Sequence, residues 1–180
     1  MKAAEQMVDM VGKINRFISA REGPVNLQKV DIQEITETLR TEFAPILGKR
    51  KILWPGQVGS GEIIADKSAL LRIFRNLIDN ALKHGGKGMT RLTIRHREES
   101  NFHVFSFSDN GVGIKEKDRG MIFEKFCRPE RSGGAMGAGL GLAIVKELAE
   151  LHGGRIWVDK GVKHGATFYV SIPKSPEITH

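Results

Sequence analysis

Apolar positions near the start of the chain recur at steps of three and four residues. They are Met7, Met10, Val11, Ile14, Phe17 and Ile18. This spacing places them on one stripe and predicts a helix that ends before Gly23 and Pro24, because both residues disfavour its continuation. The helix either covers the core of its own domain or forms the end of a longer helix that pairs elsewhere, and the spacing favours neither.

A second helical stripe begins after Asp31. Asp31 with Glu34 three residues later is a capping-box pattern, in which the two side chains satisfy free N–H groups of the first turn. We expect Pro45 to kink the last turn and Gly48 to end the helix. Its expected buried face consists of Ile32, Ile35, Leu39, Phe43, Ile46 and Leu47.

The period of the pattern changes after residue 50, where short alternating runs and helical stripes follow one another. This order predicts one layered α+β domain, residues 23–180, behind an N-terminal helical stub, residues 1–22. The expected strands are 51–54, 62–66, 90–97, 102–109, 155–160 and 166–173, and the expected helices are about 67–84 and 140–151, with a short helical turn at 120–126.

Composition narrows the class of protein. The chain has 180 residues, 40% of them hydrophobic and 27% charged, as in soluble globular domains. Its net charge of +7 favours an anionic partner, such as nucleic acid, phospholipid or a phosphorylated small molecule. The single cysteine, Cys127, excludes an internal disulfide and fits a reducing compartment. Without a signal-peptide pattern or an apolar run of bilayer length, we expect a soluble, cytosolic chain with no membrane segment.

Polar side chains interrupt the helix expected at 67–84. Asn76, Asn80, Lys83 and His84 cluster along one flank of its apolar face, although asparagine is a poor helix former. A carboxamide oxygen can bind Mg²⁺, and a neighbouring lysine can neutralise a phosphate. Alternatively, the asparagines face solvent and His84 is a C-terminal helix charge.

A turn signature, Asp109-Asn110-Gly111, follows the strand expected at 102–109. A plain hairpin accounts for these three residues. The second glycine, Gly113, and the return to an apolar residue at Ile114 fit a backbone brought close to a planar ligand. In that reading, Asp109 accepts a hydrogen bond from an exocyclic amine.

Residues 137–142, GAGLGL, lead into the helix expected at 140–151. A glycine-rich turn before a helix offers unpaired N–H groups and a favourable dipole to an anion, commonly phosphate. The stretch matches neither the Walker loop nor the dinucleotide fingerprint. Close packing of the helix on a sheet is the alternative, but the glycine density over 132–141 predicts a mobile lid.

Aromatic and basic residues alternate in the segment 122–132 between these two motifs. Phe123 and Phe126 stand three residues apart, as anchors of a core or a lid do. Arg128 and Arg131 are candidates for contacts with phosphate oxygens, although we expect at least one of them to be a solvated charge.

Taken in order, the motifs NLIDNALKH, DNGVGI, IFEKFCR and GAGLGL, followed by HGGRIWV, resemble those of one known family. They are similar to the N box, first glycine box, phenylalanine box and second glycine box of the sensor histidine kinase ATP-binding domain, over residues 66–172. The resemblance implies the Bergerat-type fold: a two-layer α/β sandwich with a mixed, mostly antiparallel sheet backed by three helices. It also implies ATP or ADP as ligand, held between a helix and a lid.

The resemblance assigns roles to individual residues. Asn80 would carry Mg²⁺, assisted by Asn76, while Lys83 and Arg128 would approach the phosphates. Asp109 would bind the adenine amino group. The remaining implied nucleotide contacts are His84, Gly111, Gly113, Ile114, Gly137, Ala138, Gly139, Leu140, Gly141, Leu142 and Thr167.

The chain departs from a complete histidine kinase in one respect. A phosphoacceptor histidine is usually followed by Glu or Asp, and none of the six histidines is. We therefore expect the catalytic half of a kinase, either cut within the dimerisation element or naturally short. It would bind ATP without phosphorylating itself on histidine, and its partners would be a histidine-bearing dimerisation domain and a response regulator.

Three alternatives remain at this stage. A serine kinase of the anti-sigma type uses the same ATP pocket, and a pseudo-kinase would bind nucleotide only as a scaffold. A nucleic-acid-binding module fits the basic charge, but Lys and Arg are spread along the chain without a recognition-helix pattern, so we expect no nucleic acid partner.

Overall fold

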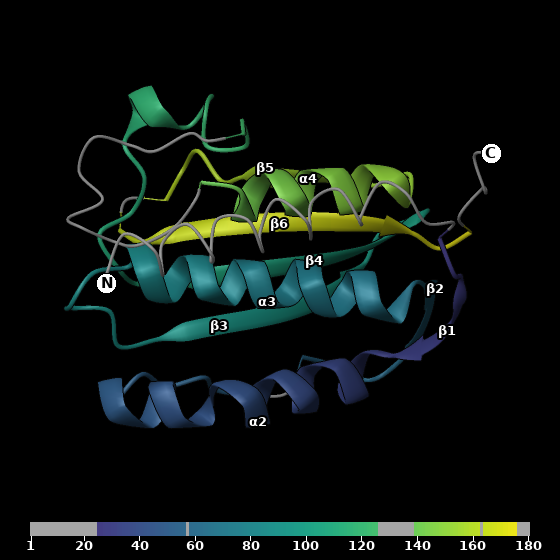
Figure 1. The fold of residues 1–180 in the computed structure, drawn as a ribbon, viewed down its shortest axis with the longest axis horizontal. Helices are drawn as coiled ribbons and strands as arrows, with labels where there is room; N and C mark the ends of the chain where they lie inside the picture. Colours follow the sequence, from purple (N-terminus) through teal and green to yellow (C-terminus); the bar gives the residue numbers. More distant parts are fainter. Residues whose placement is uncertain (1–24, 57, 126–138, 163, 176–180) are drawn as a thin grey trace, which may run out of the picture.

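Helices cover one face of a sheet in the computed structural model, which describes residues 25–56, 58–125, 139–162 and 164–175. Helices α3 and α4 lie next to each other across the sheet, and α2 packs along α3 (Figure 1). The elements in chain order are β1 (Gln28–Asp31), α2 (Ile32–Arg50), β2 (Glu62–Ala65), α3 (Lys67–His84), β3 (Leu92–Glu98), β4 (Phe102–Asp109), the 3₁₀ turn η1 (Glu116–Asp118), α4 (Gly141–Leu151), β5 (Arg155–Val158) and β6 (Ala166–Pro173).

The main sheet has four strands in the order β3-β4-β6-β5, and every neighbouring pair is antiparallel. A parallel bridge between Leu53 and Arg91 extends it beside β3 and makes it mixed. Strands β1 and β2 form a separate antiparallel pair. The expected two-layer α+β sandwich, with a mostly antiparallel sheet and three helices, is confirmed among the described residues.

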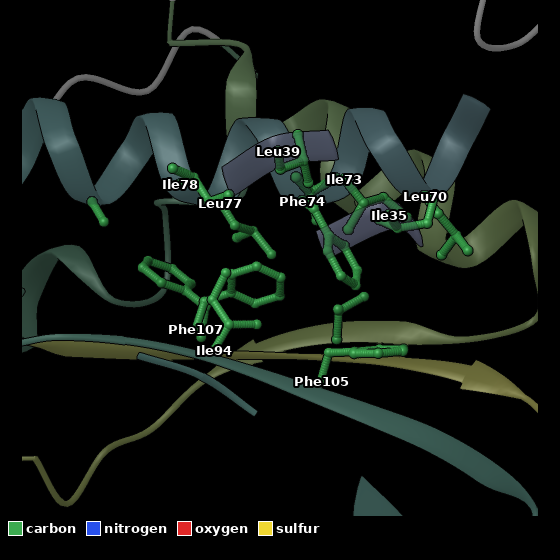
Figure 2. Close-up of a cluster of buried hydrophobic side chains, with 14 of the residues drawn as sticks. Ile35, Leu39, Leu70, Ile73, Phe74, Leu77, Ile78, Ile94, Phe105 and Phe107 are labelled. Carbon is green, nitrogen blue, oxygen red and sulfur yellow. The ribbon is translucent and has the colours of Figure 1, made fainter. Parts of the chain in front are cut away.

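The core lies between the helices and the sheet. The ring of Phe74 on α3 meets the rings of Phe105 and Phe107 on β4 edge to face, each at 4.9 Å between centroids (Figure 2). Leu70, Leu77 and their neighbours on the same stripe of α3 are buried, as the sequence pattern predicts. Burying each such side chain stabilises the fold by about 1.5–3 kcal/mol before entropy is counted.

Helix α2 begins as predicted but differs from the prediction at Glu34, at Ile46 and at its C-terminal end. The Asp31 carboxylate accepts a hydrogen bond from the N–H of Gln33, at 2.7 Å, so it is an N-cap. Glu34 does not complete the capping box, because it forms an ion pair with Lys67, at 2.6 Å. Ile46, expected in the buried face, is exposed, and the helix passes the expected stop at Gly48 to end at Arg50.

One short strand was predicted wrongly, and another was missed. The strand expected at 51–54 is reduced to the single bridge residue Leu53, and β1 was not expected. At the helical turn expected at 120–126, the N–H of Ile122 donates to the carbonyl of Asp118 at 3.2 Å and that of Glu124 to Met121 at 2.9 Å. The 3₁₀ turn η1 precedes it, and residue 126 lies outside the described residues. The predicted stub, residues 1–22, lies outside the described residues, so the domain division stays a prediction.

Candidate functional site

The start of α4 meets the middle of α3. Helix α4 begins at Gly141, and no described side chain caps its first turn, so its first N–H groups are open to a ligand. A Cβ atom placed on Gly141 would lie 3.3 Å from Oδ1 of Asn76. The Nδ2 group of Asn76 donates to the Arg72 carbonyl at 2.7 Å, which fixes the carboxamide with its oxygen toward α4.

The next turns of α3 carry the other predicted polar residues. Asn80 is half-buried, and its side chain makes no hydrogen bond to the residues that the structure describes. Lys83 pairs with Asp79 one turn earlier, at 3.3 Å, and both side chains are exposed. Partial desolvation and the neighbouring Lys83 ammonium lower the pKa of His84, although part of its side chain is exposed to solvent. The C-terminal half of α3 thus offers one unsatisfied carboxamide and one accessible cation.

Asp109 is the last residue of β4, and the turn that follows it packs against Gly85 at the C-terminal end of α3. Its carboxylate is half-buried and accepts a hydrogen bond from the N–H of Gly111, at 2.8 Å. Burial raises the pKa of Asp109, while the N–H groups of Gly111 and Ala166 act in the opposite direction. This partly desolvated carboxylate is a strong acceptor for one more donor.

Glycines let three segments approach one another around Asp109. A side chain at Gly111 would overlap the backbone of Gly85, at the end of α3. Gly113 has a φ of +75°, and a Cβ there would lie 2.7 Å from the carbonyl oxygen of Gly165, before β6. Backbone packing alone therefore explains the two glycines of the turn, independently of any ligand.

Asn110 has a structural role that the sequence analysis did not assign. Its Oδ1 accepts hydrogen bonds from the N–H groups of Thr90 and Arg91, at 3.0 and 2.9 Å. Its Nδ2 donates to the Thr90 hydroxyl at 2.9 Å. These hydrogen bonds connect the turn after β4 to the start of β3 and hold Asp109 in position.

The remaining predicted pocket residues divide into those that the structure describes and those that it does not. Thr167 lies one position beyond the partner of Asp109 on β6, and its hydroxyl donates to that of Ser108 at 2.9 Å. Leu140 is buried, whereas Leu142 and Ile114 are partly buried against the core. Gly139 has a φ of +66°. Arg128, Gly137 and Ala138, with most of the predicted lid, lie outside the described residues.

Arg50 was also missed, and it holds the end of α3 from the neighbouring helix. Its guanidinium donates to the carbonyl of Leu82 and, at 2.8 Å, to that of Gly86. These carbonyls flank Lys83 and His84. No sequence signal marks this contact, since its acceptors are backbone atoms more than thirty residues away.

A divalent cation would find few protein ligands here. Among the described residues, no group of three His, Cys, Asp or Glu side chains could hold a metal ion. The oxygens of Asn80 and Asn76 are ligands of the type that Mg²⁺ accepts when phosphate oxygens and water complete its octahedron. The donor set therefore fits a metal that arrives with a phosphorylated ligand.

A sandwich that joins an uncapped helix start to a half-buried carboxylate is the arrangement of one class of ATPase domain. The model of the family described as histidine kinase-, DNA gyrase B- and HSP90-like ATPase matches residues 65–176, more than half of the chain. The chain belongs to this family, which binds ATP.

Individual relatives are sensor proteins and histidine kinases. The alginate biosynthesis sensor protein KinB of Pseudomonas aeruginosa is 31% identical over 176 residues, which cover 94% of this chain and 29% of that protein. The mycobacterial sensor histidine kinase MprB has a TM-score of 0.68 at 29% identity, covering 84% of this chain and 99% of the solved one. The ATP-binding domain of PrrB from Mycobacterium tuberculosis has a TM-score of 0.65 at 25% identity, covering 83% and 98%.

These comparisons confirm the resemblance inferred from the four motifs. The chain is a domain of the sensor histidine kinase type, and the solved chains that it matches along nearly their full length include the sensor histidine kinase MprB and the ATP-binding domain of PrrB. It spans less than half the length of KinB.

Proposed function

We propose that this domain binds Mg²⁺-ATP and transfers its γ-phosphoryl group to a histidine on a separate dimerisation domain. The observation that carries the proposal is the meeting of Asn76 with the uncapped start of α4, at one end of a site that has Asp109 at the other. A nucleotide has the matching chemistry, with polyanionic phosphates at one end and an exocyclic amine at the other.

The purine end would be recognised by Asp109. Its half-buried carboxylate keeps an acceptor site beside the hydrogen bond from Gly111, and an adenine amino group is a suitable donor. Ile114 would line the same pocket, whereas the side chain of Thr167 lies on the same face of β6 as Tyr169 and donates to Ser108. A guanine presents an oxygen at the corresponding position, so the carboxylate would favour adenine over guanine.

The phosphate end would be recognised by the first N–H groups of α4 and by Lys83. A helix N-terminus binds phosphate through its free amides and its dipole. Asn80 and Asn76 would hold Mg²⁺, which neutralises charge on the phosphates when bound. Lys83 would exchange its exposed pair with Asp79 for a phosphate oxygen, and Arg128 would add a second cation at the terminal phosphate.

The transfer needs groups beyond this domain. The bond between the γ-phosphorus and the bridging oxygen breaks, a bond to an imidazole nitrogen forms, and ADP leaves. The attacking nitrogen is the one with the free lone pair, and the proton on the other ring nitrogen passes to a base beside the acceptor, which we place on the dimerisation domain. The phosphohistidine would then supply a response regulator. None of the helices in the described part of the chain is long and apolar enough to span a membrane, and we propose that the domain works in the cytosol.

Nucleotide affinity measured by calorimetry, with and without Mg²⁺, tests the binding site. For Asn80→Ala we expect the gain in affinity that Mg²⁺ gives to fall about tenfold, equivalent to about 1.4 kcal/mol, because a metal ligand is lost. Asn101→Ala, which changes an exposed loop residue, is the matched control. An unchanged Mg²⁺ dependence in Asn80→Ala would remove that residue from the metal site.

Labelled ATP tests the reaction. We expect acid-labile, base-stable label on a supplied histidine hairpin from a related kinase, and none on this chain alone. Label on a serine-bearing protein in place of the hairpin would contradict histidine transfer. Nucleotide binding without transfer to either acceptor would indicate a scaffold.

A further inference from the structure

The face of the sheet that points away from the helices carries a cluster of arginines and aromatic rings. Side chains alternate between the two faces of a strand. Because Ile94, Phe168 and Val170 pack into the core, their strand neighbours Arg95 and Tyr169 project from the opposite face. The outer cluster comprises Arg95 and Arg97 on β3, Tyr169 on β6, and Arg155 and Trp157 on β5.

The aromatic rings of the outer cluster hold two of its arginines in place. Trp157 and Tyr169 are cross-strand partners and stack, with centroids 5.3 Å apart and planes at 14°. The guanidinium of Arg155 lies 4.9 Å from the centroid of Trp157, and that of Arg97 lies 5.6 Å from the centroid of Tyr169. Such cation–π contacts restrict the side chains before any partner arrives.

Charge on the outer cluster is predominantly positive. Its three arginines are exposed, whereas Trp157 and Tyr169 are partly buried. Two carboxylates stand at its margin: Glu99 contacts Arg97 at 2.7 Å, and Asp159 lies 3.4 Å from the Tyr169 hydroxyl. Trp, Tyr and Arg are the residues enriched at the energetic centres of protein interfaces.

We propose that the outer cluster is a docking surface for an acidic polypeptide segment of a partner protein. Planar guanidinium groups bind carboxylates in a bidentate manner. The ion pair between Arg97 and Glu99 shows that this surface already binds one carboxylate. Single-stranded nucleic acid fits less well, because its bases would need free ring faces. Here the rings stack on each other and lie under the guanidinium groups of Arg155 and Arg97.

Fluorescence of Trp157 gives a local readout of docking. The chain has two tryptophans, and Trp54 is buried, so Trp54→Phe leaves Trp157 as the single emitter. Poly-L-glutamate is the probe, titrated at low salt into the 180-residue chain. We expect a saturable change in Trp157 emission and at least about a fivefold loss of affinity in Arg95→Gln/Arg97→Gln/Arg155→Gln. ADP affinity should stay unchanged in this variant, because the cluster is on the other face from the proposed nucleotide site.

The control variant Lys49→Gln/Lys87→Gln/Lys115→Gln removes the same charge from three exposed lysines elsewhere. Equal loss in both variants would show unspecific attraction by the net charge and overturn the proposal, as would the absence of any emission change. Oligo-dT is titrated in parallel. Tighter binding of oligo-dT that depends on the same three arginines would assign the surface to nucleic acid and also overturn the proposal.

Discussion

The Nε2 atom of His152 accepts a hydrogen bond from the backbone N–H of Asp66, at 3.1 Å. The other ring nitrogen, Nδ1, lies 2.7 Å from the carbonyl oxygen of Leu148 and must carry the proton, since a carbonyl can only accept. The ring is buried. Because Asp66 caps α3 and His152 follows α4, the imidazole joins the two helices that meet at Asn76 and Gly141.

We expect His152→Ala to lower the free energy of unfolding by about 2–4 kcal/mol, because it leaves a cavity and a partly buried N–H group without its acceptor. Urea denaturation followed by circular dichroism measures the change. His164→Ala, at an exposed position, should stay within about 0.5 kcal/mol of the parent. Equal stability of the two variants would show that the imidazole bridge adds nothing.

Gly141→Ala should separate binding from stability. Because Gly141 is the first residue of α4, the preference of up to about 1 kcal/mol for alanine over glycine inside helices applies only in part, and the free energy of unfolding should stay within about 1 kcal/mol of the parent value in the alanine variant. Its Cβ would lie 3.3 Å from Oδ1 of Asn76 and press that carboxamide away from the start of α4. We expect ADP affinity to fall by about threefold to tenfold in calorimetry, with Mg²⁺ present.

Gly48→Ala is the matched control for this prediction. A Cβ at Gly48, inside α2, meets no atom within 4 Å, so it should add helix stability and leave ADP affinity unchanged. If both variants bind ADP as the parent does, the contact between Asn76 and Gly141 has no part in binding.

The sequence pattern predicted an element correctly where the residues of that element alone determine its structure. Helix α3 was predicted with its observed ends, because Asp66 caps its start, a pair of glycines follows its end, and its apolar stripe is continuous. Strands β1 and β2 pair across more than thirty positions, and β1 has a single buried residue, Val30. Such a strand carries almost no local signal.

In the candidate site, too, residue types could be predicted from the sequence, but their contacts could not. The motifs drew attention to Asn76, Asp109 and Gly141 as residue types with suitable chemistry. The contact that brings Asn76 to Gly141 depends on how α3 and α4 pack, and the fastening of the turn by Asn110 depends on β3. The hydrogen bonds from Arg50 to the end of α3 use only backbone acceptors. No spacing rule along the sequence records these contacts.

Nucleotide affinity should depend on pH through Asp109. Burial raises the pKa of this carboxyl above its ordinary value, and an adenine amine would bind the ionised form. Binding would therefore lower the pKa again, and affinity should fall as pH decreases through the pKa of the free domain. Calorimetry with ADP between pH 7.5 and 5 measures the effect.

Asp109→Asn isolates this titration from that of the ligand, since asparagine keeps an oxygen for the N–H of Gly111. At pH 7.5 we expect the variant to bind ADP about tenfold to a hundredfold more weakly, the value of a hydrogen bond to a charged group. Its remaining pH dependence should be that of ADP alone. Parallel curves for the two proteins would exclude Asp109 as the titrating acceptor.

A histidine pair at the other end of β4 should make stability fall in weak acid. Nε2 of His96 lies 3.1 Å from Nδ1 of His103, a distance that needs one donor and one acceptor, so both rings cannot be charged without disrupting the contact. Desolvation lowers the pKa of both rings. Lys174 lowers both further, the two rings repel when charged, and Glu98 acts in the opposite direction.

The direction in which the free energy of unfolding changes with pH follows from the lowered pKa values of the two histidines. An unfolded histidine titrates near 6.5, so the folded state binds fewer protons than the unfolded state below that pH. The contribution of the pair of histidines to the free energy of unfolding is present above pH 6.5 and is lost as pH falls toward their pKa values in the folded state. The carboxyls with lowered pKa are Glu42 and Glu98, with an ordinary value of 4.5, and Asp66, with an ordinary value of 3.8, and they act at lower pH. Asp109, with a raised pKa, acts in the opposite direction.

We therefore expect the free energy of unfolding to be level from pH 8 to 7 and to decrease from pH 6.5 to 5. His96→Gln should flatten this decrease, because it removes one titrating ring while an amide can still bond to His103. His84 has a lowered pKa as well, so His84→Gln is the control that measures the share of His84 in the decrease. An undiminished slope in His96→Gln, with urea titrations at each pH, would show that the pair does not cause the acid sensitivity.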